Sequence, residues 1–439
     1  MTAARPAEPP TEDLPEDLSR LAALHGVATS YSPSPDRTVA ASATAVALAL
    51  AALGVDTRGP GAVRAALAAR EDELRERLLP PTVVARTGGG TPAALAALPE
   101  GTALRVETEQ GEIRADAGQL PAGYHRLTAT APDGRTSRAH LIVAPDRLPT
   151  PAGRSYGLLV QLYSLLSRRS WGMGDLGDLG ELAAWAGRAL GAGFVQVNPL
   201  HAAVPGAPTD PSPYRPSSRR FPDPVHLRIE AVPEFAYVPG PDRVRALQER
   251  AGRLREGVLE KGALIDRDAV WELKRDALEL LREVPLGPGR RAAYCDYLAE
   301  QGTALEDHAT WCALAEVHGS DWHRWPEELR DPRSAETARA RGELMDRVDF
   351  HSRLAWLTDT QLTAAQHTAR EAGMPVGIVH DLAVGVHPQG ADAWAQQEYF
   401  AAGMSVGAPP DAFNARGQDW GLPPWRPDRL AGSGYAPFR

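Results

Sequence analysis

Cysteine is scarce in this sequence. Cys295 and Cys312 are the 2 cysteines of its 439 residues, so a disulfide framework is excluded, and their spacing is not that of a metal site. Two reduced, buried thiols in a reducing compartment are the expected state. Nothing in the sequence indicates a metal or another cofactor.

An excess of basic residues is also missing. The sequence has 47 Lys and Arg against 56 Asp and Glu, which gives a formal net charge of −9. Nucleic acids and anionic membranes are bound through clustered Lys and Arg, so we expect neither as a partner. A neutral ligand is compatible with this charge balance.

Long hydrophobic runs are absent as well. Residues 40–55 come nearest to one, but they are mostly alanine, and as a helix they would reach only ~24 Å, short of the ~30 Å core of a bilayer. Residues 1–16 are rich in Pro, Glu and Asp, so they do not form a secretory signal and are expected to be disordered. We therefore expect a soluble, cytoplasmic chain.

The composition is that of a globular protein, 43% hydrophobic and 23% charged, and the length predicts two or three domains. Apolar residues at helical spacing predict an N-terminal helical segment over residues 17–81, which ends at a pair of prolines. Short β-type runs separated by glycine turns then predict a β-sandwich-like accessory domain over residues 82–150.

Residues 151–439 have a different pattern. Two apolar runs, 157–163 and 194–199, flank a helix predicted at 179–190, which is the pattern of two parallel strands joined by a helix. A mostly helical insertion at about 240–345 and a helix at 347–372 precede a third buried strand, 374–386. This order predicts an α/β fold, either a barrel or a doubly wound sheet.

In both of these folds, ligands bind at the carboxyl ends of the strands. Asp381 follows the third strand, where a carboxylate is costly unless it is partnered. It either points into a cleft or accepts hydrogen bonds from backbone amides of the next loop. Tyr214 and Trp394 either stack on sugar rings or pack in the core. The other polar residues at these strand ends are Tyr163, Asn198, His201, Ser212, His380 and Asp392.

Near the C-terminus, residues 407–421 combine turn formers with a phenylalanine and a tryptophan. A segment of this composition has little regular periodicity and is typical of a binding loop. Rigid prolines and exposed aromatic rings suit polymer ligands whose ring faces need a platform.

Four stretches together resemble one family, the 4-α-glucanotransferases, also called amylomaltases or disproportionating enzymes (glycoside hydrolase family 77). The stretches are 158–178 (LLVQLYSLLSRRSWGMGDLGD), 210–230 (DPSPYRPSSRRFPDPVHLRIE), 377–394 (GIVHDLAVGVHPQGADAW) and 407–421 (GAPPDAFNARGQDWG). The N-terminal extension is similar to that of the bacterial long-form enzymes, so the resemblance spans nearly the whole chain.

The resemblance implies a (β/α)8 barrel and the transfer of α-1,4-glucan segments between maltodextrins, such as maltotriose, by retaining double displacement. It implies that Asp381 holds the sugar next to the bond that is cut, and that Ser212 and Tyr214 contact the acceptor sugar. It also implies that residues of the 407–421 segment cover the bound glucan. These residues are Asp411, Phe413, Gln418 and Trp420.

One departure from the family concerns catalysis. Retaining transfer needs two carboxylates about 5–5.5 Å apart, and the family carries its nucleophile in an Arg-x-Asp-His element on strand four, which this sequence lacks. We count about three of eight barrel strands. We therefore expect the catalytic carboxylates beyond Arg439, in a chain that is C-terminally truncated and inactive alone. The alternatives are a non-catalytic glucan-binding protein and, less in keeping with these segments, an α-amylase-type hydrolase.

Overall fold

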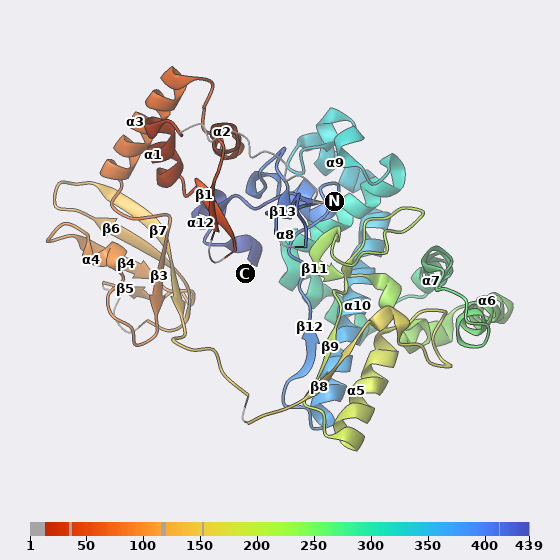
Figure 1. The fold of residues 1–439 in the computed structure, drawn as a ribbon. Coiled ribbons are helices and arrows are strands. Elements are labelled where there is room, and N and C mark those ends of the chain that lie inside the picture. The colour runs from red at the N-terminus through yellow and green to blue at the C-terminus, as the bar shows by residue number, and fades with distance from the viewer. Residues whose placement is uncertain (1–13, 35–36, 116–119, 152, 412, 439) are drawn as a thin grey trace. The chain divides into compact units, whose positions relative to one another are not determined.

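The computed structural model describes residues 14–34, 37–115, 120–151, 153–411 and 413–438. These residues divide into two compact units (Figure 1), one formed by Met1–Thr150 with Glu398–Arg439 and the other by Pro151–Gln397. The division at Gln397 falls inside the region 151–439 that the sequence predicts as one domain. Most of the segment predicted as disordered, 1–16, lies outside the described residues, and Glu16 already belongs to the first helix.

The first unit begins with the predicted helices. They are α1 Glu16–Leu24, α2 Ala43–Ala52 and α3 Pro60–Glu76. Leu21 and Leu50 are fully buried between them. Between α1 and α2 the prediction of helix is wrong, because β1 Ser30–Ser34 and β2 Arg37–Ala40 pair as an antiparallel hairpin. The prolines of this stretch cannot donate helical hydrogen bonds. Within the described residues, no helix is both long and apolar enough to cross a membrane.

Five strands of the first unit form one sheet in the order β3-β7-β6-β4-β5. Its strands are β3 Thr82–Arg86, β4 Ala103–Glu107, β5 Ile113–Arg114, β6 Gly123–Thr130 and β7 Thr136–Ala144, with the short helix α4 Ala93–Ala96 between β3 and β4. The β-type runs read from the sequence lie in these strands. Alternate residues such as Leu127 and Leu141 are buried on one face, as expected for a sheet that covers a core on one side.

Residues 398–439 pack in the same unit. They contain the antiparallel hairpin β13 Val406–Ala408 and β14 Gln418–Leu422, helix α12 Pro427–Gly432 and the 3₁₀ helix η8 Ala436–Phe438. The hydroxyl of Thr82 donates to the carbonyl of Ala431 at 2.6 Å, and a side-chain nitrogen of Arg426 donates to the carbonyl of Leu53 at 2.7 Å. Both contacts join this C-terminal segment to the N-terminal elements.

The second unit is built on a three-stranded, purely parallel sheet in the order β12-β9-β8. Its strands are β8 Gly157–Val160, β9 Phe194–Val197 and β12 Gly377–His380, with α5 Leu176–Leu190 between the first two and α10 Met345–Glu371 before the third. Helices α5 and α10 pack together and against the sheet (Figure 1). The predicted α/β unit is thus confirmed, but the third strand is shorter than the apolar run 374–386, because residues after His380 bond to the hairpin described next.

The insertion between β9 and α10 is mostly helical, as predicted. It contains the short antiparallel hairpin β10 His201–Ala202 and β11 Ser218–Pro222 and the helices α6 Pro241–Leu259, α7 Arg267–Arg282, α8 Pro288–His318 and α9 Ala335–Glu343. The remaining short helices of the chain are α11 Ala391–Ala395 and the 3₁₀ turns η1 Leu162–Ser164, η2 Pro224–His226, η3 Ile229–Ala231, η4 Pro233–Tyr237, η5 Trp322–Arg324, η6 Glu327–Leu329 and η7 Gln397–Tyr399.

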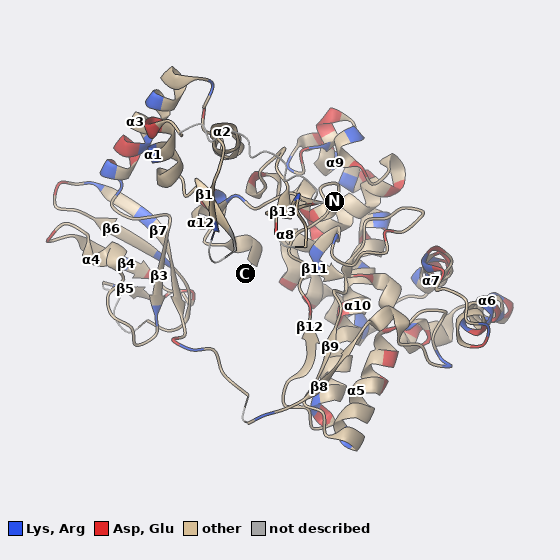
Figure 2. Cartoon of the chain, in the orientation of Figure 1, with Lys and Arg blue, Asp and Glu red and all other residues tan. Residues whose placement is uncertain are grey.

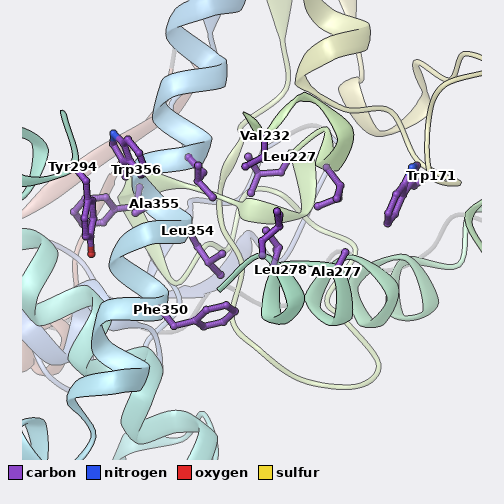
Figure 3. Close-up of a cluster of buried hydrophobic side chains, with 14 of the residues drawn as sticks. Trp171, Leu227, Val232, Ala277, Leu278, Tyr294, Phe350, Leu354, Ala355 and Trp356 are labelled. Carbon is purple, nitrogen blue, oxygen red and sulfur yellow. The ribbon is translucent and has the colours of Figure 1, made fainter. Parts of the chain in front are cut away.

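One apolar cluster joins α6, α7 and α8 to α10. Figure 3 shows Phe350 and Leu354 of α10 gathered with Leu278 of α7 and with Leu227, all buried. Acidic and basic residues both lie along α6 and α7 (Figure 2), where Arg250 pairs with Asp276 at 2.7 Å. Because such exposed ion pairs contribute little, the apolar cluster is what holds these insertion helices to α10.

The two cysteines differ from the prediction of two buried thiols. Both are free, but Cys295 is exposed and Cys312 is half-buried. The reason is the helix period, since Tyr294 and Tyr297 turn toward the core and Cys295 lies on the other face of α8. Burial raises the pKa of the Cys312 thiol, so it stays protonated.

A buried guanidinium anchors the start of α5. Arg228, only 3% exposed, binds Asp175 at 2.8 Å, Asp178 at 2.5 Å and Glu181 at 2.8 Å. Asp175 and Asp178 also cap α5 reciprocally. A Cβ at Gly177 would lie 2.4 Å from Arg228 Nε, so the guanidinium fits only because this position is glycine. The buried Lys274 beside this cluster donates to two backbone carbonyls.

Replacing Arg228 by leucine should destabilise the second unit strongly, because Asp175 and Asp178 would be left as buried, unpaired carboxylates. We expect a loss of about 3–5 kcal/mol in the free energy of unfolding, measured by urea unfolding with tryptophan fluorescence. Arg169→Leu is the matched control: Arg169 binds the same Glu181 but is 70% exposed, so its loss should be about 0.5 kcal/mol. Equal effects of the two variants would contradict this account.

Candidate functional site

Two of the predicted site residues meet although they are 167 residues apart in the chain. The Tyr214 hydroxyl donates to Asp381 Oδ2 at 2.9 Å, and this hydrogen bond raises the pKa of Tyr214. The Tyr214 side chain is exposed and Asp381 is half-buried. Within the described residues, no backbone amide donates to this carboxylate. The structure therefore does not match the interpretation in which backbone amides bind Asp381, and the interpretation in which Asp381 points into a cleft stays a prediction.

The two loops that carry Tyr214 and Asp381 are tied together by backbone contacts. His387 N donates to the carbonyl of Pro216 at 2.7 Å, and Asp392 N donates to the carbonyl of Ser217 at 3.0 Å. The Ser217 hydroxyl accepts from Ala391 N at 2.9 Å. A Cβ at Gly390 would lie 2.6 Å from the Ser217 backbone, so this approach requires a glycine. The Tyr214 loop is consequently fixed against the segment that follows β12.

Asp392 has a positioning role in this arrangement. It is buried, and its Oδ2 accepts from Arg219 N at 2.8 Å. Burial raises its pKa. In the sequence Asp392 is one of the polar residues expected at the strand ends, with no role assigned to it. Its partner Arg219 is 173 residues away, so no local pattern could have found this contact.

Ser212 lies in the same loop as Tyr214. Its N–H donates to Asp210 Oδ1 at 2.9 Å, and its hydroxyl accepts from Tyr214 N at 3.4 Å. Ser212 also lines a cavity of about 300 Å³, together with Thr209, His226, Trp271, His308 and other residues of the insertion. Tyr214 and Asp381 do not line this cavity. Ser212 thus stands between the cavity and the Tyr214–Asp381 pair.

Trp394 is not available to a ligand. It is fully buried with Trp311 and Trp325 in one aromatic cluster, and its indole Nε1 donates to the carbonyl of Leu329 at 3.1 Å. Of the two interpretations left open for Trp394, the structure matches packing. Tyr163 carries the guanidinium of Arg267 over its ring, 4.5 Å from the ring centroid.

The other four predicted site residues belong to the first unit and are described by themselves. Part of the predicted loop is regular, since β13 and β14 pair there, and Gln418 and Trp420 lie on β14 and are joined by a hydrogen bond of 3.1 Å. Asp411 Oδ1 accepts from Phe413 N at 2.8 Å. Phe413 is 94% exposed and Trp420 39%. This hairpin therefore carries two exposed aromatic rings; that they form a platform for a ligand stays a prediction.

The chain belongs to the 4-alpha-glucanotransferase family. The model of that family matches residues 160–439, and the model of the MalQ N-terminal beta sandwich domain matches residues 78–145. The chain is 45% identical to the 4-alpha-glucanotransferase of Mycobacterium tuberculosis (strain ATCC 25618 / H37Rv) over 97% of its own length and 63% of that protein. It is 32% identical to the Haemophilus influenzae 4-alpha-glucanotransferase over 73% of its length and 48% of that protein.

Solved structures agree with this assignment. The amylomaltase of Corynebacterium glutamicum matches with a TM-score of 0.82 and 36% identity, over 96% of this chain and 62% of that one. The Streptococcus agalactiae amylomaltase, solved in complex with acarbose, has a TM-score of 0.53 at 20% identity over 65% of this chain and 55% of that one, which is a likeness of fold alone. The chain spans 63% of the length of the mycobacterial relative.

Two buried histidines of the cavity make the stability of the second unit depend on pH. Burial lowers the pKa values of His226 and His308 to about 3, from an ordinary 6.5. Below pH 6.5 the unfolded chain binds protons that the folded chain does not, so the free energy of unfolding falls as the pH falls through this range. At pH 5 each of the two histidines should lower the free energy of unfolding by about 2 kcal/mol relative to its value at neutral pH.

His308→Phe tests this dependence, because His308 already packs on the Phe221 ring with centroids 4.7 Å apart. Relative to wild type, the variant should gain about 2 kcal/mol in free energy of unfolding between pH 7.5 and pH 5. The control Leu264→Phe places the same ring at a position that is 94% exposed, so its effect should be the same at both pH values. A difference for His308→Phe that is independent of pH would contradict the neutral, buried imidazole.

Proposed function

We propose that this chain binds α-1,4-glucans, that is maltodextrins such as maltotriose, as part of a 4-α-glucanotransferase that moves glucan segments between them. Membership of the family supports the substrate class. The observation that carries the proposal is the hydrogen bond between Tyr214 and Asp381, since it joins the two residues whose sequence context resembles the sugar contacts of the family.

The chemistry of this pair suits a sugar. A carboxylate accepts hydrogen bonds from two neighbouring sugar hydroxyls, and charge-assisted hydrogen bonds of this kind are the stronger ones. Tyr214, 48% exposed, offers an aromatic face to the apolar side of a pyranose ring. Ser212 supplies a hydroxyl two residues away. In this proposal Asp381 holds the sugar beside the bond that is cut, and Ser212 and Tyr214 contact the acceptor.

We propose further that β8, β9 and β12 are the first three strands of a (β/α)8 barrel. The likeness to the Corynebacterium glutamicum amylomaltase supports this architecture. In such a barrel the site lies at the carboxyl ends of the strands, where Asp381 is found after β12. The residues Asp411, Phe413, Gln418 and Trp420 would cover the bound glucan and exclude water. Two free thiols favour a cytoplasmic location.

The catalytic carboxylates form a separate part of the proposal. The 439 residues contain no Arg-x-Asp-His element, and retaining transfer needs a nucleophile and an acid/base about 5–5.5 Å apart. We place neither among these residues. The chain by itself should bind glucans without transferring them.

Titration calorimetry with maltoheptaose tests the binding part. Asp381→Asn should weaken binding about tenfold or more, because the carboxylate is lost while the shape is kept, and Tyr214→Phe should weaken it by a smaller factor. Asp296→Asn, an exposed carboxylate on α8, should bind as wild type does. Unchanged affinity of Asp381→Asn would remove Asp381 from the site.

Incubation with maltotriose tests the catalytic part. If the nucleophile is absent from these residues, neither glucose nor longer dextrins should accumulate over hours at micromolar protein. Formation of glucose together with longer dextrins would show that the chain carries its own catalytic carboxylates, and it would leave the proposed binding site intact.

A further inference from the structure

The backbone N–H and carbonyl of Ala383, two residues after Asp381, each form a hydrogen bond with a side chain. Ala383 N donates to His201 Nε2 at 3.3 Å. Arg219 Nη1 donates to the Ala383 carbonyl at 2.8 Å. Ala383 itself is fully buried. Both backbone polar groups of this buried residue thus bind side chains and not the backbone of a neighbouring strand, at the point where the chain leaves β12.

Both side chains come from one hairpin. His201 lies on β10 and Arg219 on β11, and these two strands pair with each other. The backbone N–H of Arg219 also donates to Asp392 at 2.8 Å, so the same hairpin binds the segment at Ala383 and again nine residues later. The loop that carries Tyr214 connects the two strands of this hairpin. One structural element therefore governs the positions of both Tyr214 and Asp381.

His201 must be neutral to accept a hydrogen bond at Nε2, because an imidazolium has no free lone pair. The groups that face it are Arg219, His380 and Asp381. Burial, together with the charges of Arg219 and His380, lowers the pKa of His201 to about 4 against an opposing effect of Asp381. At neutral pH the imidazole therefore carries its proton on Nδ1 and presents Nε2 as an acceptor.

We propose that His201 and Arg219 are positioning residues that grip the Ala383 peptide and thereby hold the Asp381 carboxylate at hydrogen-bonding distance from Tyr214, ready for a glucan. This inference rests on the proposed function, because it concerns the same sugar site. Neither residue touches the sugar in this proposal. Their effect is preorganisation: a carboxylate already fixed in its binding position does not lose further freedom when the ligand arrives.

Replacement of the acceptor is the direct test. His201→Met keeps the approximate size of the side chain but offers only the weak acceptor of a thioether sulfur, whereas His201→Gln keeps an amide oxygen that can accept from Ala383 N. The affinity of the 439-residue chain for maltoheptaose should fall about tenfold in His201→Met and stay within about threefold of wild type in His201→Gln. His367→Met, on an exposed face of α10, is the matched control and should bind as wild type does.

Arg219 offers a second, independent pair of variants. Arg219→Lys keeps a donor near the Ala383 carbonyl, and Arg219→Met removes it. Affinity should follow the same order, with Arg219→Met about tenfold weaker than wild type and Arg219→Lys between the two. Thermal unfolding of each variant confirms that it is folded, and the Arg219 pair decides the question if His201→Met does not fold.

A double-mutant cycle separates positioning from a general loss of structure. In this proposal the hydrogen bonds of His201 and Arg219 with Ala383 act through Asp381. Adding His201→Met to Asp381→Asn should therefore lower the affinity for maltoheptaose almost no further, which is a non-additive result. Two results would overturn the proposal that His201 and Arg219 position Asp381. One is an additive loss of affinity in the double mutant, and the other is wild-type affinity of both His201→Met and Arg219→Met. These outcomes differ from failure of the proposed function, which is wild-type affinity of Asp381→Asn or the absence of glucan binding by the wild-type chain.

Discussion

The second unit depends on the buried charge of Arg228. Its guanidinium is held by Asp175, Asp178 and Glu181 on α5, and its backbone N–H and carbonyl both bind the side-chain amide of Gln361 on α10. One residue thus joins the helix that links β8 to β9 and the helix that precedes β12. A buried charge must keep all of its partners, so the segment after β11 has little freedom relative to the two helices that cover the sheet.

A short series of contacts connects Arg228 with the candidate site. Gln366, one and a half turns beyond Gln361 on α10, accepts from Ile378 N at 2.6 Å, which fixes the register of β12 against its own helix. Asp381 follows β12 directly. The loop with Tyr214 ends at β11, and β11 leads into the segment that carries Arg228. A series of contacts that begins at the buried Arg228 therefore leads to the hydrogen bond between Tyr214 and Asp381.

The sequence predicts the local elements well and the long-range contacts poorly. Apolar runs around residues 157–163 and 194–199 identify β8 and β9 because continuous apolar runs are typical of parallel strands. The cluster around Arg228 has no such signal, since its partners are 47 to 53 residues away and an Arg or Asp in a helical pattern normally faces water. The sequence does not predict the contact between Asp381 and Tyr214, because spacing carries no information across 167 residues; the resemblance to a family implies only that both belong to one sugar site.

The contacts that define the Tyr214–Asp381 pair all lie within Pro151–Gln397. No residue outside this unit takes part in the hydrogen bond between Tyr214 and Asp381. The same is true of the close approach of Gly390 to Ser217 and of the hydrogen bonds of His201 and Arg219 with Ala383. In the proposed function, holding a sugar and cutting a bond need different groups: the first uses the Asp381 carboxylate, and the second needs two carboxylates placed about 5–5.5 Å apart. Binding energy assists catalysis only when the reacting bond is fixed relative to those two carboxylates, so the proposed role of the contacts around Asp381 is to fix the position of the bound sugar.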